Sequence, residues 1–141
     1  MIFLDTNVVS ELLRPSPHPA VRTWSKAAPY DEVCIASAVE AELRAGVERL
    51  PDGRRKRLLG RDLDLYLASA FGDRIFPFDR AAARFYAEFV AARSRAGRPA
   101  GLADALIAAT ARAHGAKLLA TRNTKDFEGC GVALVNPWEA P

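Results

Sequence analysis

The amino terminus carries the sequence feature that most constrains the fold. Three consecutive apolar residues, Ile2-Phe3-Leu4, lead directly into Asp5. Continuous apolarity without polar alternation is typical of a strand that is buried on both faces of a parallel sheet. Asp5 would then lie just past the carboxyl end of that strand. Because ligands bind outside the carboxyl ends of strands in open α/β sheets, Asp5 is a candidate site residue.

Segments that favour strands alternate with segments that favour helices along the whole chain. Further strands are expected at 33–36, 74–78, 117–120 and 132–135, and helices at 8–14, 19–27, 37–50, 54–70, 80–96 and 102–111. This order predicts an α/β fold with a mainly parallel sheet covered by helices on both faces. The length of 141 residues, without repeats or linkers, predicts one domain over residues 1–141.

Local patterns predict how several of these elements begin and pack. Ser37 and Glu40 have the spacing of a capping box, which predicts Ser37 as the N-cap of the third helix. Asp79 is the predicted N-cap of the helix at 80–96. Pro77 favours an edge position for the third strand, because proline cannot donate to the ladder. The helix at 54–70 is predicted to have a broad apolar side built largely from leucines.

Composition restricts the class of protein. Half of the residues are hydrophobic and 26% are charged, as in globular proteins. No apolar run approaches the roughly 20 residues that span a bilayer, and the start lacks a basic leader, so we expect a cytoplasmic protein without a membrane partner. Cys34 and Cys130 form no CxxC pair, and we expect neither a disulfide nor a zinc site.

The overall charge leans basic. A formal net charge of +3 and a pI of about 9.1 are compatible with a nucleic-acid partner. Basic residues are concentrated in one stretch that includes Arg54, Arg55 and Arg57. The charge run alone favours a solvated helix face over a binding surface.

Three acids share an unusual placement. Asp5 follows a strand, Glu42 lies one turn into the helix after the second strand, and Asp104 lies in the first turn of the most apolar helix. Each has a structural alternative: a helix cap for Asp5, an outward-facing helix residue for Glu42, and a charge that complements the helix dipole for Asp104. Converging acids would instead indicate a bound cation, and hard oxygen ligands favour Mg²⁺ or Mn²⁺.

Four segments, in order, resemble the signature segments of the PIN domain family. They are residues 3–7, Glu42 after the second strand, residues 102–110 and residues 119–127. The resemblance covers the whole chain and is greatest to the VapC- and FitB-like toxins of bacterial toxin–antitoxin pairs. It implies an α/β/α sandwich around a parallel sheet. It also implies a Mg²⁺- or Mn²⁺-dependent ribonuclease that cuts RNA until a cognate antitoxin occludes its site.

The resemblance further implies how the chain assembles. A homodimer is expected, and with the antitoxin a larger complex that binds operator DNA through the antitoxin. Apolar residues at 8–13, or on the helix at 54–70, are candidate dimer surfaces. The basic residues Arg54, Arg55 and Arg57 would suit RNA, or equally the acidic groups of an antitoxin.

Carried over residue by residue, the first three acids of the family fall on Asp5, Glu42 and Asp104. The resemblance implies that Asp5 and Asp104 ligate the metal, while Glu42 ligates it or orients the attacking water. The fourth position, an acid in many members, falls on Asn123, which adds no charge and leaves the second metal open. Asp126 is the nearest carboxylate; it either substitutes for that acid or only caps the following turn.

Neighbours of these residues have supporting roles in the same reading. Thr6 or Asn7 would support the first acid from the same turn. Thr121 would shape the metal or phosphate position, and Arg122 would reach the RNA. Trp138, near the carboxyl terminus, is interpreted as a core or interface residue rather than a platform for bases.

Two other functions are alternatives. An aspartyl-nucleophile phosphatase also places an acid after an apolar strand, but it carries a second acid two residues on, where this chain has Asn7. A PIN-fold binding module without catalysis is favoured only by Asn123. Three intact acids, Asp5, Glu42 and Asp104, oppose that second alternative.

Overall fold

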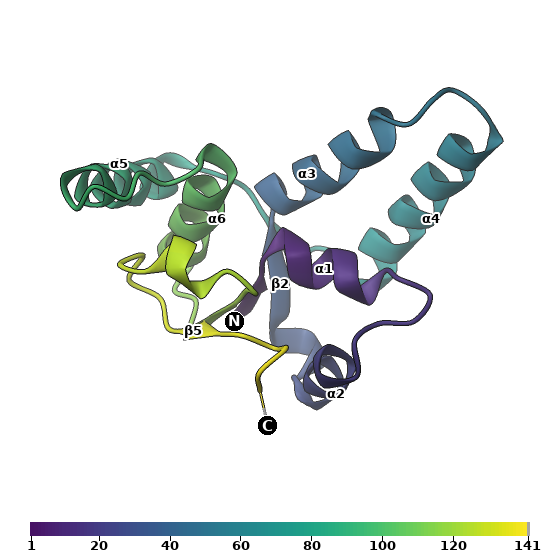
Figure 1. Ribbon diagram of the computed structural model, residues 1–141, viewed down its shortest axis with the longest axis horizontal. Coiled ribbons are helices and arrows are strands. Elements are labelled where there is room, and N and C mark those ends of the chain that lie inside the picture. Colours follow the sequence, from purple (N-terminus) through teal and green to yellow (C-terminus); the bar gives the residue numbers. More distant parts are fainter. Residues whose placement is uncertain (141) are drawn as a thin grey trace.

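The structure is a computed structural model that describes residues 1–140. Over this range the chain alternates strands and helices (Figure 1). The strands are β1 (Ile2–Leu4), β2 (Val33–Ala36), β3 (Ile75–Phe76), β4 (Leu118–Ala120) and β5 (Leu134–Val135). The α-helices are α1 (Thr6–Leu12), α2 (Pro19–Ala27), α3 (Ser37–Glu48), α4 (Arg54–Ala70), α5 (Arg80–Arg95) and α6 (Leu102–Ala113). Two short 3-10 helices are η1 (Tyr30–Glu32) and η2 (Thr124–Phe127).

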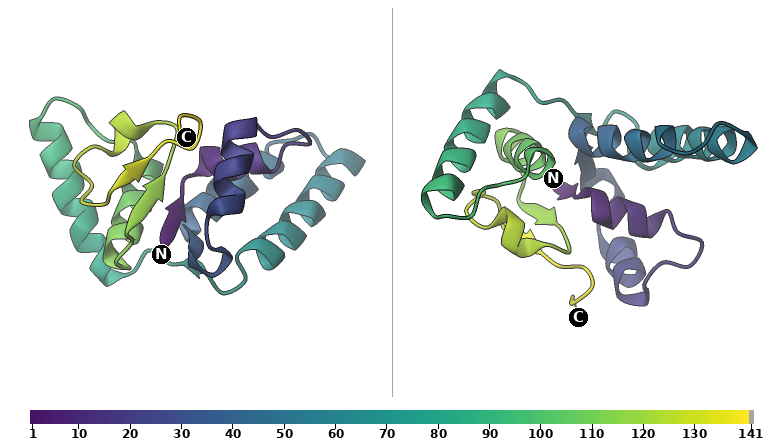
Figure 2. Two further views of the ribbon diagram at one scale, coloured as in Figure 1. Left: turned by 90° about the horizontal axis from the view of Figure 1, so that it is seen from below. Right: turned by 45° about the horizontal axis from the view of Figure 1, so that its top comes forward.

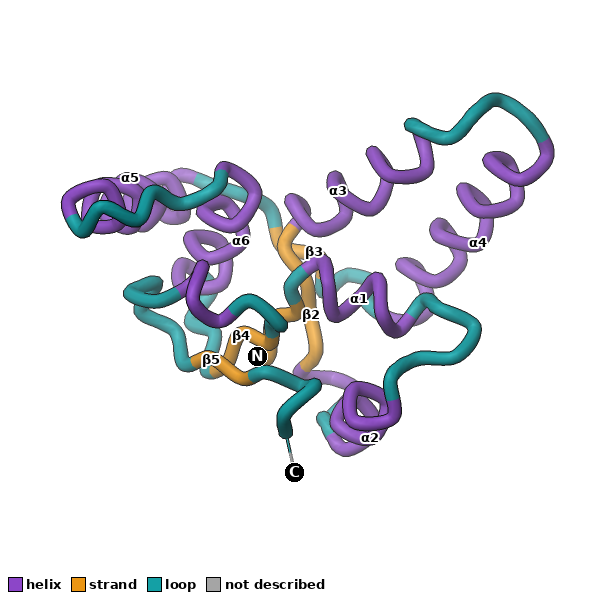
Figure 3. The backbone as a smooth tube through the Cα atoms, in the orientation of Figure 1, coloured by secondary structure: helices purple, strands orange, loops and turns teal. Residues whose placement is uncertain are grey.

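The five strands over residues 1–140 form one sheet with β1 at its centre (Figure 3). Every pair is parallel, in the order β3-β2-β1-β4-β5. Ile2 of β1 pairs with Val33 of β2 on one side and with Leu118 of β4 on the other. All three residues of β1 are buried, which confirms the prediction of a strand covered on both faces. β3 lies at an edge, as Pro77 predicts.

The chain fills the sheet in two directions from β1. It first moves through β2 to the edge strand β3, and then crosses back to β4 and finishes at β5 on the other edge. Helices α1 to α4 lie in the connections from β1 through β2 to β3, whereas α5 and α6 connect β3 to β4. Because parallel crossovers are right-handed, the two groups lie on opposite sides of the sheet (Figures 1 and 2). The reversal between β1 and β4 creates a crevice of the kind that binds ligands in α/β folds.

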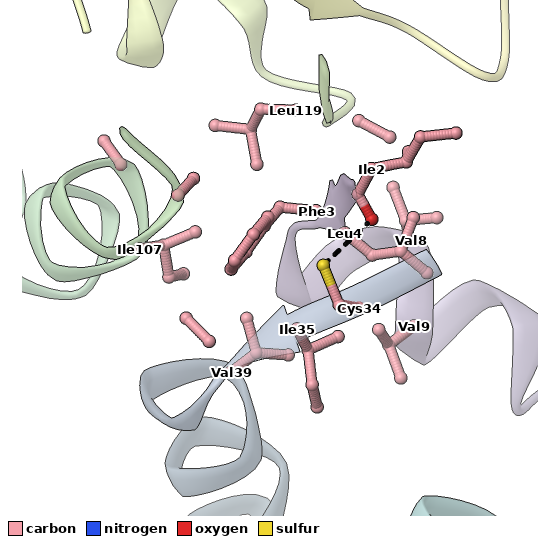
Figure 4. Close-up of a cluster of buried hydrophobic side chains, with 14 of the residues drawn as sticks. Ile2, Phe3, Leu4, Val8, Val9, Cys34, Ile35, Val39, Ile107 and Leu119 are labelled. Atoms are coloured by element: carbon pink, nitrogen blue, oxygen red, sulfur yellow. Dashed lines mark hydrogen bonds between the residues drawn. The ribbon is translucent and has the colours of Figure 1, made fainter. Parts of the chain in front are cut away.

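The hydrophobic core lies between the sheet and its helices. Figure 4 shows its centre, where Phe3 of β1, Ile35 of β2 and Ile107 of α6 meet. The helix α6 is buried on most of its surface, as its apolar sequence predicts. Cys34 belongs to this core and donates a hydrogen bond to the carbonyl of Ile2. Burial raises the pKa of the Cys34 thiol to about 12, which makes it an unreactive core residue.

Helices α3 and α4 form a hairpin that projects from the body of the molecule (Figure 1). The sequence predicts a broad apolar side on α4, but only Leu63 and Leu67 of this helix are buried. Leu58, Leu59 and Leu65 are exposed, because the helix has a packed neighbour on one side alone. None of the helices over residues 1–140 is long and apolar enough to cross a membrane.

One predicted helix start is confirmed and another is wrong. The carboxylate of Asp79 accepts a hydrogen bond from the backbone amide of Ala82 at 2.9 Å, as an N-cap does. The predicted capping box at Ser37 does not form: the N-cap position is Ala36, and Ser37 is already helical. Glu40 instead forms an ion pair with Arg44 at 2.8 Å, so it is not available to the capping position.

The structure also restricts where a partner copy can pack. Val8 and Val9 of α1 are fully buried against the sheet. They contribute to the core and present no surface, which contradicts the candidate dimer surface at residues 8–13 for these two positions. The exposed leucines of α4 remain as an apolar surface.

Two leucines on α4 provide a matched test of this packing. Leu67 is 3% exposed and Leu65 is 62% exposed. Leu67→Ala is expected to lower the free energy of unfolding by about 2–5 kcal/mol, because it leaves a cavity under the helix. Leu65→Ala makes the same change in helix propensity and is expected to stay within about 0.5 kcal/mol. Chemical denaturation of both variants, at a protein concentration where the chain is monomeric, measures the difference. Equal losses would contradict the packing of α4.

Candidate active site

Polar side chains gather at the carboxyl edge of the sheet, where β1 and β4 end side by side. They line an open cavity of about 590 Å³. The cavity contains all three acids predicted from the sequence. Its lining residues are Asp5, Thr6, Asn7, Ser10, Glu11, Arg14, Glu42, Asp104, Arg122, Asn123 and Trp138.

Asp5 is held rigidly at the end of β1. Its backbone amide donates to the carbonyl of Ala120 at 2.9 Å, which extends the β1–β4 ladder by one residue. One carboxylate oxygen accepts from the amide of Thr6 and the other from the hydroxyl of Thr121, both at 2.7 Å. Asp5 is therefore the N-cap of α1 as well as a lining residue of the cavity. Only 4% of its surface is exposed, and burial raises the pKa of Asp5.

Glu42 reaches the same cavity from α3. The second strand and the start of α3 carry it to the sheet edge, where its carboxylate accepts a hydrogen bond from the hydroxyl of Thr6 at 2.5 Å. Thr6 thus contacts both acids, Asp5 through its amide and Glu42 through its hydroxyl. Glu42 is exposed, yet it faces the other acids, whereas Glu40 points to Arg44. The sequence left open which of the two glutamates points outward.

Asp104 enters the cavity from the first turn of α6. No residue within the described part of the chain donates a hydrogen bond or forms an ion pair to its carboxylate. Burial, and then the negative charges of Asp5, Asp126 and Glu42, raise the pKa of Asp104 to about 6, and Arg93 opposes the rise. A half-buried carboxylate surrounded by other acids is favoured only when a cation or a proton compensates it.

These acids share a cavity without converging on one point. Over residues 1–140, no three His, Cys, Asp or Glu side chains form a ready-made metal cluster. The donor set nevertheless fits a hard divalent cation. Mg²⁺ keeps several waters and takes only one or two carboxylates directly, so the remaining acids can reach it through water. The uncompensated Asp104 is the observation that favours a cation here.

The turn after β4 supplies the rest of the predicted site. Thr121 is fully buried, and its hydroxyl fixes Asp5 by donating a hydrogen bond to the carboxylate. Its hydroxyl also accepts the backbone amide of Asn123 at 3.0 Å, which directs Asn123 into the cavity lining. The side chain of Asn7 accepts the amide of Arg122 at 3.3 Å and ties this turn to α1.

Several predicted residues lie elsewhere. Asp126 is exposed and does not line the cavity, although its charge acts on Asp104. Arg54, Arg55 and Arg57 lie at the start of α4, at the outer end of the α3–α4 hairpin and away from the acids (Figure 1). The structure therefore brings Arg122 to the cavity, but not Arg54, Arg55 or Arg57.

Four residues that line the acidic cavity were not predicted from the sequence. Ser10, Glu11 and Arg14 share one face of α1 and the turn after it with Asn7, as helical spacing from Asn7 could have indicated. Glu11 is already occupied: it accepts the backbone amide of His18 at 2.8 Å and pairs with Arg14. The hydrogen bond from His18 lowers the pKa of Glu11. The fourth is Trp138, which follows β5.

A second, apolar cavity of about 420 Å³ lies on the other side of α1. It is lined by aromatic and aliphatic residues such as Trp24, Tyr66 and Phe71, and contains no acid. This apolar cavity therefore offers no carboxylate for hydrolytic chemistry.

Comparison with known proteins places the chain in a family. The PIN domain matches residues 2–129. The chain is 41% identical to VapC ribonuclease Y4jK of Sinorhizobium fredii, over 99% of each protein. It is 40% identical to Toxin FitB of Neisseria gonorrhoeae, over 98% of this chain and 99% of that protein.

Solved structures agree with this assignment. The crystal structure of FitAcB from Neisseria gonorrhoeae superposes with a TM-score of 0.90 at 39% identity, covering 99% of this chain and 100% of that one. A toxin–antitoxin complex from Klebsiella pneumoniae gives a TM-score of 0.71 at 28% identity, over 99% and 100% of the two chains. The all-parallel sheet with helices on both sides is the PIN-like α/β/α fold of these neighbours. This chain belongs to the PIN domain family.

Proposed function

We propose that the chain is a Mg²⁺-dependent endoribonuclease that acts as the toxin of a toxin–antitoxin pair. The observation that carries the proposal is the meeting of Asp5, Glu42 and Asp104 in one cavity, at the crevice between β1 and β4. Relatives that match nearly the whole chain at about 40% identity are named as a ribonuclease and as a toxin. That coverage supports carrying the same class of activity to this chain.

The residues of the cavity have different proposed roles toward the ion. Asp5 and Asp104 are the proposed ligands of Mg²⁺, with Mn²⁺ as a substitute, and Glu42 ligates it or orients the attacking water. Asn123 adds an amide oxygen and no charge, which supports one firmly held ion. The chemistry a divalent ion supplies in such a site is neutralisation of charge on the phosphate and a lowered pKa of water.

The protein's own contribution is to fix these groups before RNA arrives. The backbone amide of Thr6 and the hydroxyl of Thr121 each donate to one oxygen of Asp5, which fixes the orientation of the carboxylate. Thr6 also holds Glu42 through its hydroxyl. Groups that are already oriented need little rearrangement during the reaction, which is a main source of catalytic rate in polar sites. Thr6 and Thr121 are proposed as positioning residues.

The alternatives find less support. An aspartyl-nucleophile phosphatase requires a second acid at position 7, and the amide oxygen of Asn7 is engaged with the backbone of Arg122. A non-catalytic binding module would have no need for Asp5, Glu42 and Asp104 in one cavity, where burial and then the charges of neighbouring acids raise the pKa of Asp104.

The proposed partners follow from the same relatives. A cognate antitoxin would neutralise the chain by occluding the acidic cavity, and the larger complex would reach operator DNA through the antitoxin. Among similar solved structures is a toxin–antitoxin complex, which supports such a partner. RNA is the proposed substrate, and Arg122 is its best-placed basic contact because it lines the cavity.

Removal of single acids tests the activity. Asp5→Asn and Asp104→Asn are each expected to reduce Mg²⁺-dependent RNA cleavage by at least about 100-fold, since each removes a charge from the proposed ion site. Asp62→Asn makes the same change on an exposed part of α4 and should cleave normally. Cleavage of total RNA, with and without EDTA, and growth arrest on expression are the measurements. Full activity of either site variant would refute the assignment.

The raised pKa of Asp104 predicts a pH-dependent stability effect. The folded chain binds this proton more tightly than the unfolded chain, so stability falls as pH rises from about 4 to about 6. In EDTA at pH 7, Asp104→Asn is expected to raise the free energy of unfolding by on the order of 1 kcal/mol, and the gain should vanish near pH 4. Saturating Mg²⁺ should stabilise the wild-type chain and not the variant. Thermal unfolding across this pH range measures both, and an unchanged or lowered stability at pH 7 would contradict the prediction.

We also propose that the chain is a homodimer that buries the exposed leucines of α4. Leu58 and Leu65 lie seven residues apart, on one face of the helix, and are 38% and 62% exposed. Leu58→Asp with Leu65→Asp is expected to convert a dimer into a monomer in light scattering at micromolar concentration. The paired control, Leu58→Ala with Leu65→Ala, removes area without adding charge and should weaken the dimer less. A dimer that resists the aspartates would place the interface elsewhere.

A further inference from the structure

Arg122 and Trp138 form a stacked pair on the wall of the acidic cavity. The guanidinium carbon of Arg122 lies 5.1 Å from the centroid of the Trp138 ring. Both side chains line the cavity that contains Asp5, Glu42 and Asp104. A cation over an aromatic face is attracted to it, so the contact gives the exposed Arg122 a preferred position beside the acids.

The backbone holds both members of the pair in place. Arg122 follows the buried Thr121, and its amide donates to the side chain of Asn7 at 3.3 Å. The amide of Trp138 donates to the side chain of Asn136 at 3.0 Å, in the turn that follows β5. Since β4 and β5 are parallel neighbours, both turns lie at the same edge of the sheet as the acids.

The surroundings of Trp138 differ from those of an ordinary core tryptophan. It is half-buried: one part packs against the hydrophobic core, and another contributes to a polar cavity. Arg122 is exposed, and within the described chain no carboxylate forms an ion pair with it, although four carboxylates line the same cavity. The sequence predicts Trp138 as a core or interface residue. In the structure, part of its side chain also lines the acidic cavity.

We propose that Arg122 and Trp138 form a subsite that stacks a nucleobase of single-stranded RNA beside the acids, an inference that rests on the proposed ribonuclease function. Unpaired bases stack on aromatic rings and on arginine guanidinium planes. The pair offers both surfaces next to the proposed position of the scissile phosphate. Arg14 also lines this cavity, but its charge is paired with Glu11. Trp138 is therefore a specificity-determining residue that selects unpaired RNA.

Binding to two matched oligomers separates base stacking from phosphate attraction. The probes are fluorescein-labelled oligoadenylate and an abasic oligomer with the same number of phosphates, and anisotropy is measured in EDTA so that no cleavage occurs. Wild-type chain is expected to bind oligoadenylate about ten-fold more tightly than the abasic oligomer, as one stacked base provides. Trp138→Leu should reduce this ratio to about two-fold or less, with affinity for the abasic oligomer unchanged.

Three further variants make the result interpretable. Trp24→Leu removes another half-buried tryptophan, outside the acidic cavity, and should keep the ratio. Trp138→Phe retains an aromatic face and should keep most of it. Arg122→Lys keeps the charge on an exposed residue while removing the planar guanidinium, so it should lower the ratio without affecting folding. Circular dichroism confirms that each variant is folded.

Several outcomes would overturn the subsite. It fails if wild-type chain binds the two oligomers equally, or if Trp138→Leu retains the wild-type ratio while folded. It also fails if Trp138→Leu leaves RNA binding unchanged but weakens binding of the cognate antitoxin, because Trp138 would then belong to a protein interface. A normal ratio together with no Mg²⁺-dependent cleavage would refute the ribonuclease proposal and leave RNA stacking in place, which separates the two failures.

Discussion

The hydrogen bond between Thr121 and Asp5 joins the two halves of this molecule. It lies between the ends of β1 and β4, where the strand order reverses. One residue follows β4 and the other follows β1, and they lie 116 positions apart in the chain. The backbone amide of Asp5 reinforces the junction by bonding to Ala120. Parallel strands end at one edge, and the reversal of strand order opens a crevice there, so this junction forms the floor of the cavity. The positions of Thr6, Glu42 and Asn123 all depend on it.

The same junction creates an electrostatic conflict. Asp5 is almost fully buried, and Asp104 is half-buried and repelled by Asp5, Asp126 and Glu42. Hydrogen bonds from Thr6 and Thr121 stabilise the ionised form of Asp5, but Asp104 receives no such support within the described chain. The proposed cation would turn this repulsion among carboxylates into a favourable interaction. Burial and repulsion of these carboxylates thus lower the stability of the fold at the place where the proposed chemistry needs charge. Such a loss of stability is common at active sites.

The sequence predicted the features that depend on short-range apolar patterns. β1 reads as a buried strand because Ile2-Phe3-Leu4 has no polar interruption, and α6 reads as a buried helix for the same reason. The junction of Asp5 with Thr121 could not be predicted from spacing, because it depends on strand order. The capping box at Ser37 has the right residues, but Glu40 is drawn to Arg44 instead. The leucines of α4 form an apolar pattern that the single chain does not cover, and Trp138 reaches the cavity only because β5 pairs with β4.

Asp5 caps α1 and is also a proposed metal ligand, and this combination has an evolutionary consequence. As the N-cap of α1 it needs only an oxygen that accepts the amide of Thr6, and asparagine is about as good an N-cap as aspartate. The mutational path from an active chain to a folded, silent one is therefore short. A silent copy would keep the fold and nearly all of the surface available to the proposed antitoxin, and would compete for it with the active copy. Selection on this residue would then act on the balance between the two copies in a genome, rather than on the fold.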